Sequence, residues 1–279
     1  MIGSEGLKGK IRNIANSKNL RSQEVLQMFF FERFLERLSK SKYKFNFVIK
    51  GGLLISSMIG IDNRTTMDMD TTIKGVPLKE EVIRNIISEI INVEVDDGIE
   101  FEITDISHIR EEDEYENFRV HLIANFDKIK NDMKIDITTG DAITPKEIEY
   151  LYPCMFQDES LRVLAYPLET ILAEKYESVI KRNISTTRMR DFYDLYNLYN
   201  LRKEEIDFDI LKQAIISTAN RRGSFPLMKQ AMEIIKDIKE DDYLKELWKV
   251  YLADNLYVGD LNFSETVKVV EIIAEKIAL

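Results

Sequence analysis

Apolar residues recur along the first part of the chain with two periods, one typical of helices and one typical of strands. Helical spacing fills the segments 23–40 and 79–93, and Ser22 is placed to cap the first of these helices. Alternation of apolar and polar positions, typical of half-buried strands, covers three further segments: 98–109, 117–126 and 132–141. Charge-rich turns such as 110–116 separate them. The pattern predicts a mixed sheet with helices packed on it.

From about Leu161 onward the apolar spacing is helical only. A helix begins at Pro167, Ser185 or Thr186 is placed to cap the next one, and three or four further helices follow to the end of the chain. The sequence therefore predicts an α+β fold, a mixed β-sheet with flanking helices followed by an all-helical C-terminal domain. We expect three regions, a basic segment with a helix that packs on the core, the sheet region and the helical domain: 1–44, 45–160 and 161–279.

Composition narrows the class of protein. Of the 279 residues, 44% are hydrophobic and 32% are charged, which is typical of a folded globular chain. The net charge of −10 argues against a general polyanion binder, although a local basic groove is still compatible with it. Cys154 is the only cysteine, so neither an intramolecular disulfide nor a cysteine metal site can form. With no signal-peptide core and no run long enough to cross a bilayer, we expect a cytoplasmic protein without a membrane partner.

The segment 47–74 holds the candidate chemistry. An apolar strand runs into Gly51 and Gly52, a short apolar helix and a polar turn follow, and a second strand carries Asp68 and Asp70. Side chains alternate along a strand, so the two aspartates should share one face while Met67 and Met69 point into the core. Two adjacent carboxylates repel each other. A hard divalent cation such as Mg²⁺ would relieve that repulsion.

A third carboxylate stands in a similar setting. Asp136 is flanked by Ile135 and Ile137 in the last of the alternating segments. An isolated carboxylate in a half-buried strand is costly and disfavoured by strand propensity. Asp136 should therefore have a metal or a hydrogen-bond donor beside it.

Four ordered blocks, KGG, RTTMDMD, AEKYESVIKR and RMRDFYDLYNL, resemble the AbiEii/AbiGii toxin family of abortive-infection and type IV toxin–antitoxin systems. The match runs from about Phe47 to Leu198. The resemblance implies the polymerase-β-type nucleotidyltransferase fold, with residues 45–160 as the catalytic domain. It also implies that the helical domain contributes Lys175 and Asp191 to the cleft.

The resemblance assigns the glycine pair to nucleotide binding. Gly51 and Gly52 would let the backbone approach the triphosphate, and the amides opening the next helix would face it with positive partial charge. A plain strand-to-helix turn is the alternative. Thr66 would lie near the triphosphate as a hydroxyl donor. Arg64 would either contact a phosphate or pair with Asp62 across the turn.

The resemblance also assigns the acidic residues. Asp68, Asp70 and Asp136 would coordinate Mg²⁺ or Mn²⁺, and Asp136 would assist deprotonation of the incoming hydroxyl. Lys175 would sit against the nucleotide phosphates, the alternative being a surface lysine paired with a neighbouring glutamate. Asp191 would order Lys175 or the base, the alternative being a helix N-terminal turn with salt bridges, and Asp194 is the weaker candidate.

These assignments predict a Mg²⁺-dependent nucleotidyltransferase that transfers a nucleoside monophosphate from a nucleoside triphosphate to an acceptor. The resemblance implies a toxin in phage defence that a cognate antitoxin neutralises, with the 3′ end of a transfer RNA as the acceptor in some relatives. Basic residues that could follow the RNA backbone are Lys181, Arg182, Arg188 and Arg190. The alternatives are a catalytically silent member that binds nucleotide or docks a partner, and a metal-dependent nuclease.

Overall fold

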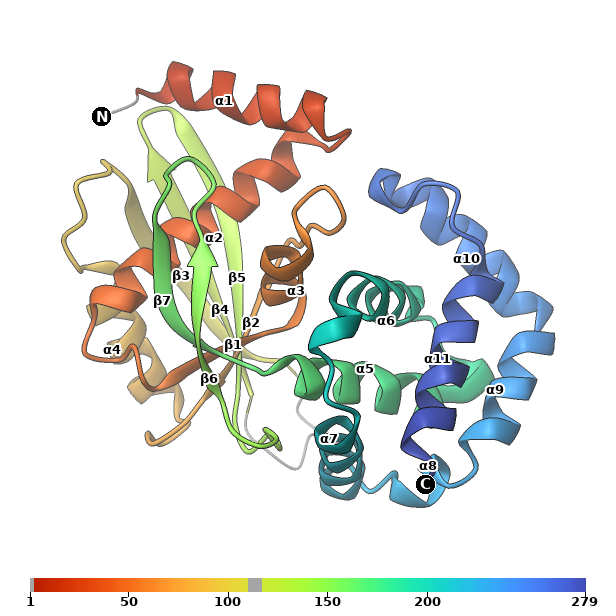
Figure 1. Cartoon of the computed structure of the whole chain (residues 1–279). Helices are drawn as coiled ribbons and strands as arrows, with labels where there is room; N and C mark the ends of the chain where they lie inside the picture. Colours follow the sequence, from red (N-terminus) through yellow and green to blue (C-terminus); the bar gives the residue numbers. More distant parts are fainter. Residues whose placement is uncertain (1–2, 110–116) are drawn as a thin grey trace. The chain divides into compact units, whose positions relative to one another are not determined.

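The computed structural model describes residues 3–109 and 117–279, so the predicted turn at 110–116 lies outside the described residues (Figure 1). The chain forms two compact units. The first comprises Met1–Gly140 with Ile148–Ala165, and the second comprises Asp141–Glu147 with Tyr166–Leu279. None of the helices in the described ranges has both the length and the hydropathy that a lipid bilayer requires.

A mixed sheet of seven described strands forms the centre of the first unit, in the order β3-β4-β5-β2-β1-β7-β6. The strands are β1 (Phe47–Lys50), β2 (Met69–Ile73), β3 (Glu100–His108), β4 (Phe118–Phe126), β5 (Ile129–Thr138), β6 (Ile148–Pro153) and β7 (Ser160–Ala165). β2 runs parallel to β5 and β1 runs parallel to β7, and the other neighbours are antiparallel. The predicted mixed sheet with helices on it is confirmed.

The described residues of this unit form four helices: α1 (Ser4–Ser17), α2 (Ser22–Lys40), α3 (Gly51–Ile59) and α4 (Glu80–Ile91). α2 and α4 contact each other and the sheet, and Phe30, Phe31 and Phe34 of α2 are fully buried. The predicted Ser22 cap is wrong by one residue. Arg21 is the N-cap, and the backbone N–H of Arg21 donates a hydrogen bond to the Glu24 side chain at 3.0 Å.

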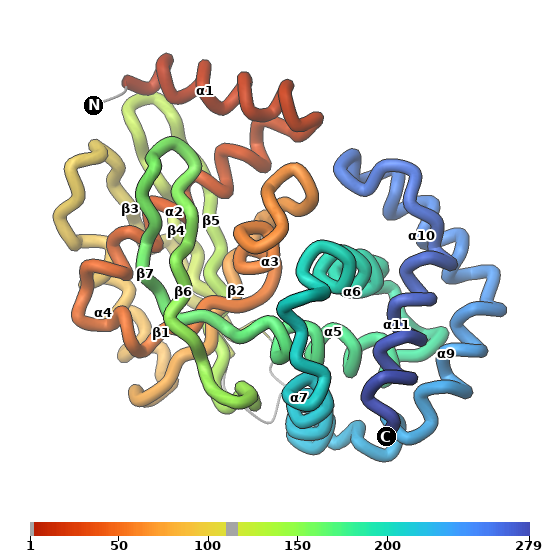
Figure 2. The backbone as a smooth tube through the Cα atoms, in the orientation of Figure 1, coloured from red at the N-terminus to blue at the C-terminus, as the bar shows by residue number. Residues whose placement is uncertain are grey.

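The helical character expected from Leu161 onward is wrong for the first few residues. Ser160–Ala165 form β7, which lies next to the edge strand β6 and pairs in parallel with β1 and antiparallel with β6 (Figure 2). The last three residues of β7 are buried without alternation. A short continuous apolar run of this kind does not distinguish a buried strand from a helix by periodicity.

The second unit is all helical apart from its connections: α5 (Leu168–Arg182), α6 (Met189–Arg202), α7 (Phe208–Arg221), α8 (Phe225–Met228), α9 (Ala231–Glu240), α10 (Asp242–Asp254) and α11 (Phe263–Ile277). α5 contacts α6, α7, α8 and α9 and is the central helix of the unit (Figure 2). Its face bearing Leu172, Tyr176 and Ile180 is fully buried. The amphipathic spacing from Pro167 onward therefore predicted this core correctly.

The start of α6 differs from the sequence prediction. The helix begins at Met189 with Arg188 as its N-cap, so neither Ser185 nor Thr186 caps it directly. A 3₁₀ turn at Asn183–Ser185 intervenes, and the Thr186 hydroxyl accepts the backbone N–H of Arg188 at 3.1 Å. Serine and threonine stabilise such turns as readily as helix starts, which explains the misplacement.

Candidate active site

Four charged side chains lie in register across four adjacent strands of the first unit. Arg119 on β4 pairs with Asp136 on β5, Asp136 pairs with Asp70 on β2, and Asp70 pairs with Lys50 on β1. Residues directly opposite each other on neighbouring strands place their side chains on the same face. We refer to Arg119, Asp136, Asp70 and Lys50 as the charge row, because two carboxylates stand between two cations.

Arg119 is the hydrogen-bond donor beside Asp136. Its Nε and Nη2 donate to Oδ1 and Oδ2 of Asp136, both at 2.7 Å. These hydrogen bonds raise the pKa of Arg119, burial opposes the shift, and attraction to Asp136, Asp68 and Asp70 adds to it. All three predicted carboxylates therefore lie within electrostatic reach of one guanidinium.

Asp68 lies just before the strand, a position that differs from the prediction. β2 begins at Met69, which is fully buried, whereas Met67 is 47% exposed and does not point into the core. Residues 67 and 68 form a bend, so the alternation of a strand does not apply to them. The Thr66 hydroxyl instead orients Asp68, with its Oγ1 2.8 Å from Asp68 Oδ1.

The glycine pair packs directly against this acidic cluster. Gly51 opens α3 with φ +64°, and a Cβ there would lie 2.0 Å from Asp70 Oδ2. A Cβ on Gly52 would lie 2.8 Å from Thr66 Oγ1 and 3.0 Å from Arg64 Nη2. Only glycine lets the start of α3 come this close to the carboxylates. The N-cap residue Lys50 has no side-chain acceptor, so it cannot cap the first amides of α3.

Arg64 was expected to contact either a phosphate or Asp62. Arg64 is 2% exposed and donates to the backbone oxygen of Thr65. Asp62 forms an ion pair with Lys18 Nζ at 3.0 Å. The Arg64 guanidinium lies next to Gly52, and its role toward a phosphate stays a prediction.

The carboxylates of this site can be tested for their fit to Mg²⁺. Within the described residues, no three or more histidine, cysteine or acidic side chains are grouped as a ready-made metal cage. Mg²⁺ commonly takes only one or two protein carboxylates and completes its shell with water and substrate phosphate. Asp68 and Asp70 fit that requirement. Both oxygens of Asp136 already accept hydrogen bonds from Arg119.

A second polar cluster lies in the helical unit, and we call it the lysine cluster. Lys175 on α5 reaches Asp191 Oδ1 at 2.7 Å and Asp194 Oδ2 at 2.9 Å, both on α6. The hydroxyl of Ser178 donates to Asp191 Oδ2 at 2.9 Å. Three residues apart on one helix, the two aspartates face the same side. The structure thus brings Lys175 and Asp191 together, while their catalytic role stays a prediction.

The lysine cluster keeps its lysine charged. Burial by itself would lower the pKa of Lys175, but the attraction and hydrogen bonds of Asp191 and Asp194 outweigh it, so the pKa is raised above its ordinary value. Asp194 is fully buried and the Asp191 side chain is 7% exposed. An ionised lysine is the most direct way to stabilise two such carboxylates.

The four basic residues predicted to follow RNA are all exposed. Lys181 and Arg182 end α5, and Arg188 and Arg190 flank the start of α6. Two tyrosines of α6 serve packing. Tyr193 and Tyr199 are buried, and the Tyr193 ring lies 5.5 Å from that of Tyr257.

Sequence reasoning missed Arg119, Lys50 and Ser178. Arg119 carried a usable signal, because it stands between Phe118 and Val120 in an alternating strand as Asp136 does between isoleucines. Nothing in the sequence relates Arg119 to Asp136, because strand register follows from the assembled sheet.

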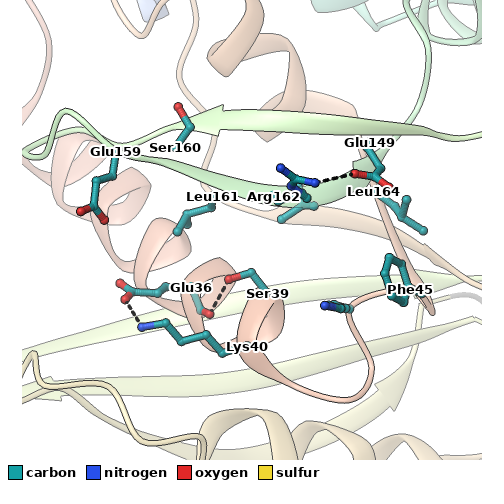
Figure 3. Close-up of a pocket in the computed structure, with 12 residues that line it drawn as sticks. Glu36, Ser39, Lys40, Phe45, Glu149, Glu159, Ser160, Leu161, Arg162 and Leu164 are labelled. Atoms are coloured by element: carbon teal, nitrogen blue, oxygen red, sulfur yellow. Dashed lines mark hydrogen bonds and ion pairs between the residues drawn. The ribbon is translucent and has the colours of Figure 1, made fainter.

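A cavity of about 280 Å³ elsewhere in the first unit contains none of these residues (Figure 3). Its walls come from α2, β6 and β7, and its charged groups are partly paired among themselves. Lys40 pairs with Glu36 at 2.6 Å and Arg162 with Glu149 at 3.4 Å (Figure 3). The cavity is therefore separate from the charge row.

Comparison with known proteins identifies the family and the fold of the chain. Residues 33–277 match the family described as "Nucleotidyl transferase AbiEii toxin, Type IV TA system". The fold is similar to that of a candidate nucleotidyltransferase from H. pylori, with a TM-score of 0.53 and 17% identity over 92% of this chain and 96% of that chain. It is also similar to JHP933 from Helicobacter pylori, with a TM-score of 0.52 and 17% identity over 92% and 93% of the two chains. No curated protein sequence matches the chain. Because the family match spans most of its length, the chain belongs to the AbiEii nucleotidyltransferase toxins.

Proposed function

We propose that this AbiEii-family protein transfers a nucleoside monophosphate from a nucleoside triphosphate to an acceptor hydroxyl, with Mg²⁺ or Mn²⁺ as its cofactor. The observation that supports this reaction best is the packing of the glycine pair against Asp70 and Thr66. It places the amides that open α3, a kind of group that binds phosphate, next to carboxylates, which bind a hard cation.

The residues of the first unit have separate tasks in this reaction. The amides that open α3 at Gly51 and Gly52 bind the triphosphate, and Thr66 holds Asp68 in place. Asp68 and Asp70 would hold the cation, which when bound supplies charge neutralisation of the phosphates. The acceptor oxygen forms a bond to the α-phosphorus, the bond to the β-phosphate oxygen breaks, and pyrophosphate leaves. The hydroxyl proton passes to a nearby carboxylate or to water.

The helical unit would contribute its ammonium group. We propose that Lys175, held protonated by Asp191 and Asp194, contacts the phosphates of the nucleotide as a point charge. Asp191 would then act as a positioning residue for Lys175, not as a base. This role rests on the resemblance of the AEKYESVIKR and RMRDFYDLYNL blocks to the family.

We further propose an RNA acceptor, the 3′ end of a transfer RNA, and neutralisation by a cognate antitoxin in phage defence. The exposed residues Lys181, Arg182, Arg188 and Arg190 support an RNA backbone contact. Family membership supports the antitoxin.

The reaction is tested by incubating the purified protein with α-labelled nucleoside triphosphates, Mg²⁺ and total RNA. Transfer of label to RNA supports the proposal, shortened RNA supports a nuclease, and nucleotide binding without turnover supports a silent member. Asp70→Ala should lower transfer by roughly 10³-fold or more, because it removes a group that stabilises the transition state. The matched control is Asp132→Asn, an exposed carboxylate on the same strand as Asp136, which should leave transfer unchanged.

The acceptor is tested separately by salt dependence. Arg182→Ala and Arg190→Ala should each weaken RNA labelling and reduce the slope of log affinity against log salt by about 0.7–0.9 if each contacts one phosphate. Nucleotide binding should be unaffected in both variants. An unchanged slope would exclude these two arginines from the RNA contact.

A further inference from the structure

A second cavity of the first unit, of about 320 Å³, contains no residue of the charge row and none of the cavity in Figure 3. Its apolar walls include three phenylalanines: Phe29, Phe126 and Phe156. We call it the aromatic cavity. Small-molecule sites have volumes of about 300–1,000 Å³ and combine apolar walls with a few polar groups. The aromatic cavity is therefore large enough for a ligand of one or two rings.

Arg33 supplies the aromatic cavity with a hydrogen-bond donor. The residue lines the cavity, and its side chain is 4% exposed. Nη2 donates to Glu32 Oε1 and Nη1 to Glu36 Oε2, both at 2.5 Å, and Glu36 also pairs with Lys40. The Nε atom of Arg33 is buried and has no hydrogen-bond partner among the described residues. Because a buried N–H without an acceptor is costly, an acceptor atom in the cavity would be stabilised there.

Asp96 supplies an acceptor at the same cavity. Of the charged residues that line it, Glu32 pairs with Arg33, and Asp97 accepts two hydrogen bonds of 2.8 Å from Arg37. Asp96 is exposed, and no residue in the described ranges forms a hydrogen bond or ion pair with its side chain. Its carboxylate is therefore available to an N–H group of a ligand.

The phenylalanines favour a flat ligand. Phe29 and Phe156 are half-buried, with ring centroids 5.5 Å apart, and Phe126 is 8% exposed. Nζ of the exposed residue Lys10 lies 5.2 Å from the centre of the Phe156 ring, and its charge offsets that of Asp96, so no net charge is selected. A water molecule would satisfy the Arg33 donor but would leave the phenyl rings without contact. A planar ring satisfies both.

We infer that the aromatic cavity binds an uncharged heteroaromatic ring that carries an amino group, the chemistry of adenine and cytosine. A ring nitrogen or carbonyl oxygen accepts the hydrogen bond of Arg33 Nε, the amino group donates to Asp96, and the ring packs on Phe156. Two sources supply such a ring: a free nucleoside and an unpaired base of RNA. The binding requires neither the metal nor the triphosphate of the proposed reaction.

The experiment measures nucleoside binding to the full chain by isothermal titration calorimetry, without divalent cations. Wild type should bind adenosine on the order of tenfold more tightly than uridine, which has no amino group. Asp96→Ala should remove this preference, and Phe156→Ala should weaken adenosine binding roughly tenfold through lost stacking. The matched controls are Asp105→Ala, an exposed aspartate, and Phe45→Ala, a phenylalanine that is 56% exposed. Both lie outside the aromatic cavity and should bind adenosine as the wild type does.

Three results would overturn the inference. The first is no adenosine binding at millimolar concentration, and the second is equal affinity of the wild type for adenosine and uridine. The third is binding that Asp70→Ala abolishes and Phe156→Ala leaves intact, since the ring would then lie at the charge row. Arg33→Lys, which keeps the charge but has no N–H at the Nε position, should weaken both nucleosides. If that variant does not fold, as judged by circular dichroism, Asp96→Ala and Phe156→Ala decide the result.

A triadenylate oligonucleotide distinguishes the two sources of the ring. Once Phe156→Ala weakens adenosine binding, tighter binding of the oligonucleotide than of adenosine to the wild type identifies an RNA base as the ligand. Weaker binding of the oligonucleotide identifies a free nucleoside. An oligonucleotide affinity that Phe156→Ala does not change would show that the RNA binds elsewhere and would exclude an RNA base from the aromatic cavity.

Discussion

The charge row in the sheet and the lysine cluster in the helical unit both stabilise buried carboxylates with cations, but the two clusters are arranged differently. In the charge row, each residue comes from a different strand, and the cations Arg119 and Lys50 stand at the two ends. In the lysine cluster, one helix supplies both carboxylates and a single ammonium lies between them. The sheet therefore places two carboxylates side by side, whereas the helices separate theirs by a cation.

The difference indicates which cluster can take an additional ligand. Every charged group of the lysine cluster is close to an opposite charge, and the cluster is mostly buried. In the first unit, Asp70 lies beside Gly51 at the start of α3, so carboxylate and helix amides adjoin each other. A site for phosphate and a cation needs these two kinds of group side by side, and a site that positions one side chain does not.

The largest expected effect is on the stability of the helical unit. Lys175→Met would leave Asp191 and Asp194 buried without their cation, and it should destabilise this unit by about 3–5 kcal/mol. Chemical denaturation followed by circular dichroism would measure the loss. The effect should appear without nucleotide or metal.

Neutralising the whole cluster separates stability from catalysis. A triple variant, Lys175→Met with Asp191→Asn and Asp194→Asn, should recover most of the lost stability, because it leaves no unpaired charge. It should not recover label transfer if Lys175 contacts the nucleotide. Recovery of both would show that the lysine cluster is only structural.

A smaller effect is expected from the close packing of the glycine pair. Gly51→Ala and Gly223→Ala place a Cβ at nearly the same φ, +64° and +65°, but only Gly51 would clash, with Asp70, since nothing lies within 4 Å of Gly223. Both should cost about 1–2 kcal/mol for the left-handed conformation, and Gly51→Ala should cost about 1–3 kcal/mol more. Denaturant titration measures both. Equal losses would contradict the close contact between α3 and Asp70.

The smallest expected effect is a change in the free energy of unfolding at alkaline pH. The pKa of Lys175 is raised in the folded chain above the ordinary value of 10.5, so its pairing stabilises the fold fully below pH 10.5 and is lost as pH rises through the folded pKa. The difference in unfolding free energy between the wild type and the triple variant should therefore be constant below that pH and shrink above it. Denaturation at a series of pH values would test this, and a difference that shrinks well below pH 10.5 would contradict it.

The amino-acid sequence predicted the features that depend on local pattern. The amphipathic spacing of α2 and α5 and the alternation in β3, β4 and β5 led to the correct elements. The glycine pair and the RTTMDMD block are in contact as expected, because they lie close in sequence. Asp136 was singled out by its apolar neighbours and has its predicted donor.

Features set by tertiary pairing could not be predicted in this way. β7 was missed because a buried strand has no alternation, and Arg119 was missed because its partner is fixed only by register. Met67 was placed wrongly because the strand begins two residues later than the alternation suggested. In each of these three cases, the strand pairing in the folded protein determines the outcome, and the local sequence pattern does not.

The parallel pairing of β2 with β5 determines when the charge row can form during synthesis. Asp70 meets Asp136 only after β5, made much later during synthesis, inserts beside β2, and a slip of one residue would turn Asp136 to the opposite face. An incomplete or misaligned chain on the ribosome would lack the assembled centre. The charge row therefore exists only once the sheet is finished.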